Sequence, residues 1–208
     1  MSYWPEFLAI ASAHFFAVAS PGPDFAVVLR QSVRFGRDNA LITSAGVGAG
    51  ILVHIIYCLV GVALLISQAP DLFNLLKYMA AAYLAYMGIQ ALRHAKPGQV
   101  EQVHPTTTQP AESFFVAFRR GFLTNALNPK ATLFFLSLFT LVISIDTPKW
   151  VQLGYGLYMA LATWAWFSFL SIMLTRARVR AFFLAKGFWF DRAIGVVLLL
   201  LATQVVLL

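Results

Sequence analysis

The chain contains few charged residues and a single cysteine. Only 11% of its 208 residues are charged and 60% are hydrophobic, whereas soluble domains average about 25% charged residues. So little polar surface excludes an ordinary soluble globule and predicts an integral membrane protein. The lone Cys58 excludes an intramolecular disulfide framework. The sequence also lacks the GxxxxGKS or GxxxxGKT pattern of a nucleotide-binding loop, which argues against an ATP-driven pump.

Six stretches of the chain are apolar enough to cross a membrane. A transmembrane helix needs about 20 apolar residues. The stretches are continuously apolar rather than alternating, which favours helices over a β-barrel. We therefore predict an all-α integral membrane protein with six transmembrane helices, at Phe7–Leu29, Ala40–Ile66, Leu72–Leu92, Gly121–Ile145, Val151–Thr175 and Ala193–Leu208.

The positive charge of the chain is confined to alternate loops. Of its 15 lysines and arginines, twelve follow the first, third and fifth predicted spans. Because short cytoplasmic loops are rich in lysine and arginine, both termini are predicted to lie on the periplasmic or extracellular side. No Lys or Arg precedes Phe7, so we expect a first span rather than a signal peptide. The net charge of +7 then reflects topology and attraction to membrane lipid, and indicates no nucleic-acid partner.

A polar linker divides the predicted spans into two sets of three. Residues 96–113 are rich in proline, threonine and glutamine, a composition that does not form a packed core. Two tandem halves with three spans each must face opposite ways across the bilayer. We therefore predict one membrane domain, 1–208, built from two inverted repeats at 1–95 and 114–208 that a cytoplasmic linker joins.

The first and fourth predicted spans are each interrupted by a proline followed by a charge. The interruptions read Gly22-Pro23-Asp24 and Asn128-Pro129-Lys130. Proline removes a backbone donor and leaves carbonyls unpaired, which is tolerated in a membrane only against other protein or a wet cavity. A packing kink is the simpler interpretation, but a charge at bilayer depth needs a partner or a function.

The helix-end rules assign a role to each residue of the two interruptions. Pro23 and Pro129 suit the first position of a new half-helix, with Gly22 and Asn128 as the N-caps. Asp24 would then lie in a first helical turn, where the macrodipole favours a carboxylate.

A cation is disfavoured in the first turn, so Lys130 requires a negative partner. One candidate is Asp24, and another is a substrate carboxylate drawn to the exposed N–H groups. The two ideas combine if Asp24 and Lys130 pair in the empty protein and separate to hold the ammonium and carboxylate of a zwitterion. The breaks would then form a site for an amino acid, and Asp24 is the nearest candidate to carry a coupled proton.

Other polar residues near the interruptions allow several interpretations. Asn125 lies one turn before Asn128, where it could line the site or bond a neighbouring helix. His54 and Cys58 share a helix face, but two ligands are too few for a metal site. His54 is therefore expected to be a packed histidine or a proton relay. The spacing of Gly46 and Gly50 favours close helix packing.

Three segments of the chain resemble the lysine-exporter (LysE/RhtB) superfamily of bacterial amino-acid exporters. They read SPGPDFAVVLRQSVRFGRDNALITSAGVGAGILVH, LLKYMAAAYLAYMGIQALR and FRRGFLTNALNPKATLFF. The resemblance implies a secondary transporter in the bacterial inner membrane that exports amino acids without a cofactor, driven by proton antiport. By resemblance, the motif positions are Pro21, Gly22, Pro23, Asp24, Asn125, Asn128, Pro129 and Lys130.

One element of the family pattern is missing. Many members carry Leu-Pro-Gln-Phe after the Asn-Pro-Lys segment, whereas residues 138–142 read Leu-Phe-Thr-Leu-Val here. The chain looks closer to the threonine and homoserine exporters, which predicts a small neutral substrate. The sequence leaves the oligomeric state open, a homo-oligomer included.

Two other classes of function remain as alternatives. An intramembrane hydrolase could use Ser20, Asp24 and either His14 or His54, but no Gly-x-Ser-x-Gly or His-Glu-x-x-His motif supports it. Divalent-metal efflux is weakened because the predicted spans contain no carboxylate or histidine cluster.

Overall fold

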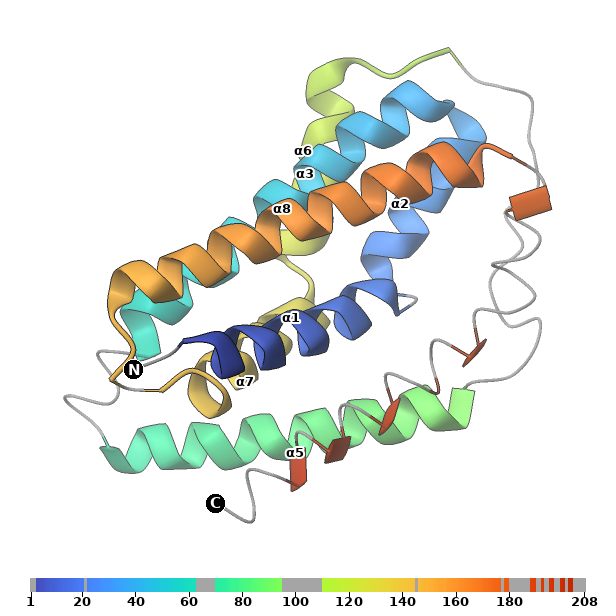
Figure 1. Ribbon diagram of the computed structural model, residues 1–208. Coiled ribbons are helices and arrows are strands. Elements are labelled where there is room, and N and C mark those ends of the chain that lie inside the picture. Colours follow the sequence, from blue (N-terminus) through green and yellow to red (C-terminus); the bar gives the residue numbers. More distant parts are fainter. Residues whose placement is uncertain are drawn as a thin grey trace.

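The computed structural model describes residues 3–20, 22–62, 70–94, 110–144 and 146–176, together with short pieces between 178 and 203. Every regular element in these residues is helical (Figure 1). The elements are α1 (Trp4–Ala19), α2 (Pro23–Arg34), α3 (Arg37–Tyr57), a π-helical turn η1 (Cys58–Val62), α5 (Pro70–His94), α6 (Phe114–Ala126), α7 (Pro129–Leu141) and α8 (Lys149–Leu174).

Both predicted interruptions break their helices in the structure. Gly22 is the N-cap of α2 and Pro23 is its first residue. Asn128 is the N-cap of α7, and its side chain accepts a hydrogen bond from the Lys130 backbone N–H. The N-cap roles predicted for Gly22 and Asn128, and the first-residue roles predicted for Pro23 and Pro129, are therefore confirmed.

Two of the described helices are long and apolar enough to cross a membrane, Arg37–Gly61 and Lys149–Leu174. The shorter apolar helix Trp4–Ala19 ends at the first break, so it falls below that length. The predicted span 193–208 lies mostly outside the described residues, as does most of the linker 96–113. The arrangement of six spans in two repeats therefore stays a prediction.

α3 and α8 form an antiparallel pair along the length of the protein (Figure 1). The Ser44 and Ser171 hydroxyls lie 2.9 Å apart near one end of the pair. Near the other end, a Cβ atom on Gly156 would lie 2.6 Å from the Ile55 side chain. The first half of α3 thus contacts the last part of α8, and the last part of α3 contacts the first part of α8. The two helices therefore run antiparallel.

Small residues bring α3 and α6 into close contact. A Cβ atom on Gly46 would overlap the Phe118 carbonyl oxygen, and one on Gly121 would overlap the Thr43 carbonyl oxygen. The packing role expected for Gly46 is therefore confirmed. Such an approach of backbones is typical of helix pairs in membranes.

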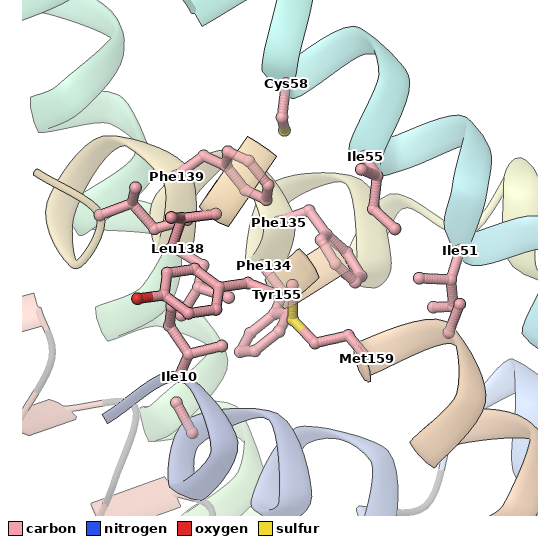
Figure 2. Close-up of a cluster of buried hydrophobic side chains, with 14 residues drawn as sticks. Ile10, Ile51, Ile55, Cys58, Phe134, Phe135, Leu138, Phe139, Tyr155 and Met159 are labelled. Carbon is pink, nitrogen blue, oxygen red and sulfur yellow. The ribbon is translucent and has the colours of Figure 1, made fainter. Parts of the chain in front are cut away.

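An apolar cluster joins α1, α3, α7 and α8 (Figure 2). Ile10 of α1, Ile55 of α3, Phe135 of α7 and Met159 of α8 are at most 1% exposed within it. Figure 2 shows these side chains pointing toward one another from the four helices. The cluster packs α1, the first half of one broken helix, against α7, the second half of the other.

The long helices each pack against both halves of a broken helix. α3 contacts α6 and α7, and α8 contacts α1 and α2. Each long helix thus spans the break in the other half of the chain, so both breaks lie against the α3–α8 pair.

Candidate functional site

A cavity lies where the two broken helices meet. Its polar lining comes from both breaks and from two further positions: Ser20, Asp24, Asn125, Asn128, Lys130, His14 and Thr163. The space open to the centres of water-sized molecules is about 50 Å³, and one water needs about 10–15 Å³ on this measure. The cavity is therefore large enough for several waters or a small organic molecule.

The cavity lies level with the middle of the long helices. Asn125 packs against Gly50, near the midpoint of Arg37–Gly61. Thr163, near the midpoint of Lys149–Leu174, also lines the cavity. The two breaks therefore meet at the depth where a bilayer would be most apolar.

Asp24 lies in the first turn of α2 and is held by two amides from the other break. The Asn125 side chain donates to Asp24 Oδ2 over 2.9 Å, and the Asn128 side chain donates to the same oxygen over 3.2 Å. Within the described part of the chain, Asp24 Oδ1 is buried and accepts no hydrogen bond. A buried carboxylate oxygen without a donor is costly, so this oxygen is available for a bound cationic group.

Lys130 lies in the first turn of α7 and reaches back across the first break. Its ammonium donates to Ser20 Oγ over 2.9 Å. A Cβ atom on Gly22 would lie 3.4 Å from Lys130 Nζ, so glycine at this position leaves room for the ammonium. Each break thus places its charged residue beside the other break.

The direct ion pair that the sequence offers as one candidate is not formed. Among the described residues, the ion pairs are Arg37–Asp38 and Arg120–Glu112. The Asn125 and Asn128 amides occupy Asp24, while Ser20 receives the Lys130 ammonium. Asp24 and Lys130 are therefore held beside each other's break by neutral side chains rather than by a direct ion pair.

His54 lies behind the site rather than in the cavity wall. Its Nε2 lies 3.0 Å from the Asn125 carbonyl oxygen and its Nδ1 lies 2.9 Å from the Tyr57 hydroxyl. That hydroxyl also donates to the Thr132 carbonyl of α7 over 3.1 Å. The Phe135 ring stacks on the imidazole at 5.4 Å between centroids. His54 is thus a packed, hydrogen-bonded residue that connects α3 to both sides of the second break.

The structure brings most of the predicted site residues together. Gly22, Pro23, Asp24, Asn125, Asn128 and Lys130 line the one cavity. Pro129 begins α7 and is not part of the lining. Pro21 lies outside the described residues. In the described ranges, no three His, Cys, Asp or Glu side chains gather as metal ligands.

Sequence reasoning assigned no place in an amino-acid site to Ser20, His14 and Thr163. His14 Nε2 and Thr163 Oγ1 lie 3.0 Å apart and connect α1 to α8 across the cavity wall. The signal for His14 was present, because an ionisable residue in an apolar span is a functional candidate by default. Thr163 had no such signal, since a threonine is common in membrane helices.

In the described residues every regular element is helical and the broken helices enclose a polar cavity at mid-length, an arrangement typical of membrane transporters. The sequence profile of the LysE type translocator family matches residues 15–208. The chain therefore belongs to the LysE type translocator family. It is a transporter and not an enzyme, so the hydrolase alternative is wrong.

Several curated proteins are similar over most of the chain. The threonine efflux protein of Escherichia coli (strain K12) is 30% identical over 189 residues, 91% of each chain. The membrane protein YahN of the same strain is 31% identical over 161 residues, 77% of this chain and 71% of that one. The leucine efflux protein of Salmonella choleraesuis is 30% identical over 148 residues, 71% of this chain and 66% of that one. No solved structure matches the chain.

Proposed function

We propose that this protein exports a small neutral amino acid of the threonine or homoserine type from the cytoplasm by proton antiport. Family membership supports translocation, and the relatives named as threonine and leucine efflux proteins support an amino acid as the substrate. The observation that carries the proposal is Asp24 Oδ1, a buried acceptor without a donor in the described residues, in a cavity that Lys130 also lines.

The cavity offers complementary ends to a zwitterion. The substrate ammonium would donate to Asp24 Oδ1, while the Asn125 and Asn128 amides keep the opposite oxygen in place. The substrate carboxylate would lie toward Lys130 and the start of α7, where both the ammonium and the helix dipole favour a negative charge. Gly22, Pro23 and Pro129 shape the breaks that allow this arrangement, and Pro21 is proposed to complete the first break.

The proposed mechanism is alternating access between two inverted repeats, 1–95 and 114–208. Support comes from the exchange of contacts between the halves, because α3 packs on the broken helix α6–α7 and α8 packs on the broken helix α1–α2. A rocking of one half against the other would open the cavity to each side in turn. The lysine and arginine distribution favours cytoplasmic loops after the first, third and fifth spans of a bacterial inner-membrane protein.

Two residues are proposed to bind and release the proton that is exchanged for the substrate. Asp24 contacts the cavity and would exchange a proton for the substrate ammonium. His54 contacts the Asn125 carbonyl and, through Tyr57, the Thr132 carbonyl of α7. A ring nitrogen that faces a carbonyl must carry a hydrogen, so the protonation of His54 decides which of these bonds can form together.

An export panel in a strain without other amino-acid exporters tests the proposal. Cells that overproduce the chain should release radiolabelled threonine or homoserine faster than the parent strain. Lys130→Met should abolish release while the protein still reaches the membrane. Lys149→Met is the matched control, since Lys149 is exposed at the start of α8. Failure of the wild type to release any amino acid, or full activity of Lys130→Met, would refute the proposal.

A further inference from the structure

The cavity has a second polar pair that the zwitterion site does not use. His14 and Thr163 are 3% and 1% exposed, and their side chains lie 3.0 Å apart. The rest of the wall near them is apolar, with Ala17, Ile51 and Phe167 among its members. A polar pair in such a wall is costly unless its hydrogen-bonding capacity is used.

The pair retains capacity after its mutual hydrogen bond. A threonine hydroxyl has one donor and two acceptor positions, and an imidazole has two ring nitrogens. One bond between them uses a single position on each side chain. A substrate hydroxyl that enters the cavity can therefore add a bond to either member without breaking the pair.

The spacing of the two polar regions fits a small hydroxylated amino acid. His14 lies six residues before Ser20, the acceptor of the Lys130 ammonium, and six helical residues rise ~9 Å. A carboxylate oxygen and a side-chain hydroxyl in such a molecule lie ~3–5 Å apart, and a hydrogen bond at each end adds about 2.9 Å. The molecule with its two bonds is therefore about as long as the axial separation of His14 and Ser20 along the chain.

We propose that the His14–Thr163 pair binds the side-chain hydroxyl of the substrate and selects hydroxylated amino acids over aliphatic ones of the same shape. This inference rests on the proposed amino-acid site at Asp24 and Lys130. Threonine and valine are the sharpest comparison, because they share a shape and differ by a hydroxyl for a methyl. A buried polar pair left facing a methyl group loses a hydrogen bond, which disfavours valine.

Competition in proteoliposomes tests the selection. Purified chain is reconstituted, uptake of radiolabelled threonine is measured, and unlabelled threonine, homoserine, valine and leucine compete. For the wild type, half-inhibition by threonine should need about ten-fold less amino acid than half-inhibition by valine. Thr163→Val keeps the volume and removes the hydroxyl, so its threonine-to-valine ratio should fall close to one. Thr140→Val is the control, because Thr140 bonds the Ser137 carbonyl of its own helix and does not line the cavity.

The outcomes separate this inference from the proposed function. A wild type that transports amino acids without preferring threonine to valine, or a Thr163→Val protein with the wild-type ratio, overturns the inference alone. A wild type that transports no amino acid overturns both. If Thr163→Val does not fold, His14→Phe provides the second variant and should narrow the ratio in the same way, and an unchanged ratio there contradicts the inference.

Discussion

Glu6 and Glu112 make equivalent contacts at opposite ends of the antiparallel α3–α8 pair. The Glu6 carboxylate accepts from the Thr147 hydroxyl over 3.0 Å, just before α8 begins. The Glu112 carboxylate accepts from the Gln31 amide of α2 over 3.3 Å, shortly before α3 begins. Glu6 lies near the start of the broken helix α1–α2 and binds the loop before α8. Glu112 lies just before the broken helix α6–α7 and binds α2, the helix before α3. This exchange is what an inverted repeat would produce at its two faces.

The first prediction is that these contacts close opposite sides of the cavity. Glu6→Gln replaces the carboxylate with a neutral amide and so weakens its hydrogen bonds, which include those from the Ser144 N–H and the Tyr155 hydroxyl. Glu112→Gln replaces the carboxylate that accepts from Gln31, and it also removes the ion pair with Arg120, whose Nη2 lies 2.7 Å from Glu112 Oε1. Loss of a charge-assisted hydrogen bond costs about 1.5–3 kcal/mol, enough to shift an open–closed equilibrium by ten-fold or more.

Thiol labelling from each side of the membrane measures this shift. Ser20→Cys in a Cys58→Ala background places one reporter cysteine beside the cavity. Glu6→Gln should increase its labelling by an impermeant reagent from one side, and Glu112→Gln from the other side. Asp38→Asn is the control, because Asp38 is exposed and pairs only with its neighbour Arg37 among the described residues. Equal labelling from both sides in the two variants would contradict separate gates.

The second prediction divides the two roles of Asn128. Its oxygen caps α7 at the Lys130 N–H, and its amide nitrogen donates to Asp24. Asn128→Ser retains a capping oxygen and removes the amide donor, so stability should change little while substrate affinity falls. Asn128→Ala removes both and should lower the stability by about 1 kcal/mol more. Thermal unfolding in detergent and substrate binding measure the two effects, and wild-type substrate binding by Asn128→Ser would show that the cap alone matters.

The breaks could be predicted from the sequence because their causes are local. Pro23 and Pro129 fix φ and cannot donate a backbone hydrogen bond, and glycine or asparagine before them caps a helix. These rules depend on neighbouring residues and on nothing distant in the chain. The sequence alone therefore predicted correctly that Asp24 and Lys130 lie in the first turns of their helices.

The partners of the charged residues could not be predicted because they depend on tertiary packing. Asp24 receives the Asn125 amide since α6 lies against α3, and that approach depends on small residues in both helices. The sequence suggested Lys130 as the partner of Asp24 because opposite charges attract. In the structure, the Asn125 and Asn128 amides donate to the Asp24 carboxylate instead. The His14–Thr163 contact joins residues 149 positions apart, a separation at which no local pattern signals a pair.

The third prediction concerns the glycine that accommodates Asn125. A Cβ atom on Gly50 would lie 2.8 Å from Asn125 Cβ and 3.0 Å from the Phe122 carbonyl oxygen. Gly50→Ala should therefore displace Asn125 from Asp24, destabilise the protein by about 1–3 kcal/mol and reduce transport. Gly154→Ala is the matched control on α8, because its Cβ would have no neighbour within 4 Å. Normal transport by Gly50→Ala would mean that the Asn125–Asp24 bond is dispensable.

The fourth prediction distinguishes the two proposed proton carriers. Exchange of labelled for unlabelled amino acid across a vesicle membrane needs the substrate site but no net proton movement, whereas export driven by a pH gradient needs both. Asp24→Asn should abolish both reactions, because Asp24 is proposed to hold the substrate ammonium. His54→Gln should retain exchange and lose most of the response to the gradient, because His54 lies outside the cavity lining.

Tyr57 connects the proton on His54 to the second broken helix. When both ring nitrogens of His54 carry a hydrogen, one donates to the Asn125 carbonyl and the other to the Tyr57 oxygen, which leaves the Tyr57 hydroxyl to donate to Thr132. When His54 is neutral with its hydrogen on Nε2, Nδ1 is an acceptor and competes with Thr132 for that hydroxyl. Tyr57→Phe should therefore behave as His54→Gln does, and Tyr78→Phe, on the exposed face of α5, should not. Gradient-driven export at the wild-type rate in both His54→Gln and Tyr57→Phe would leave Asp24 as the proton carrier.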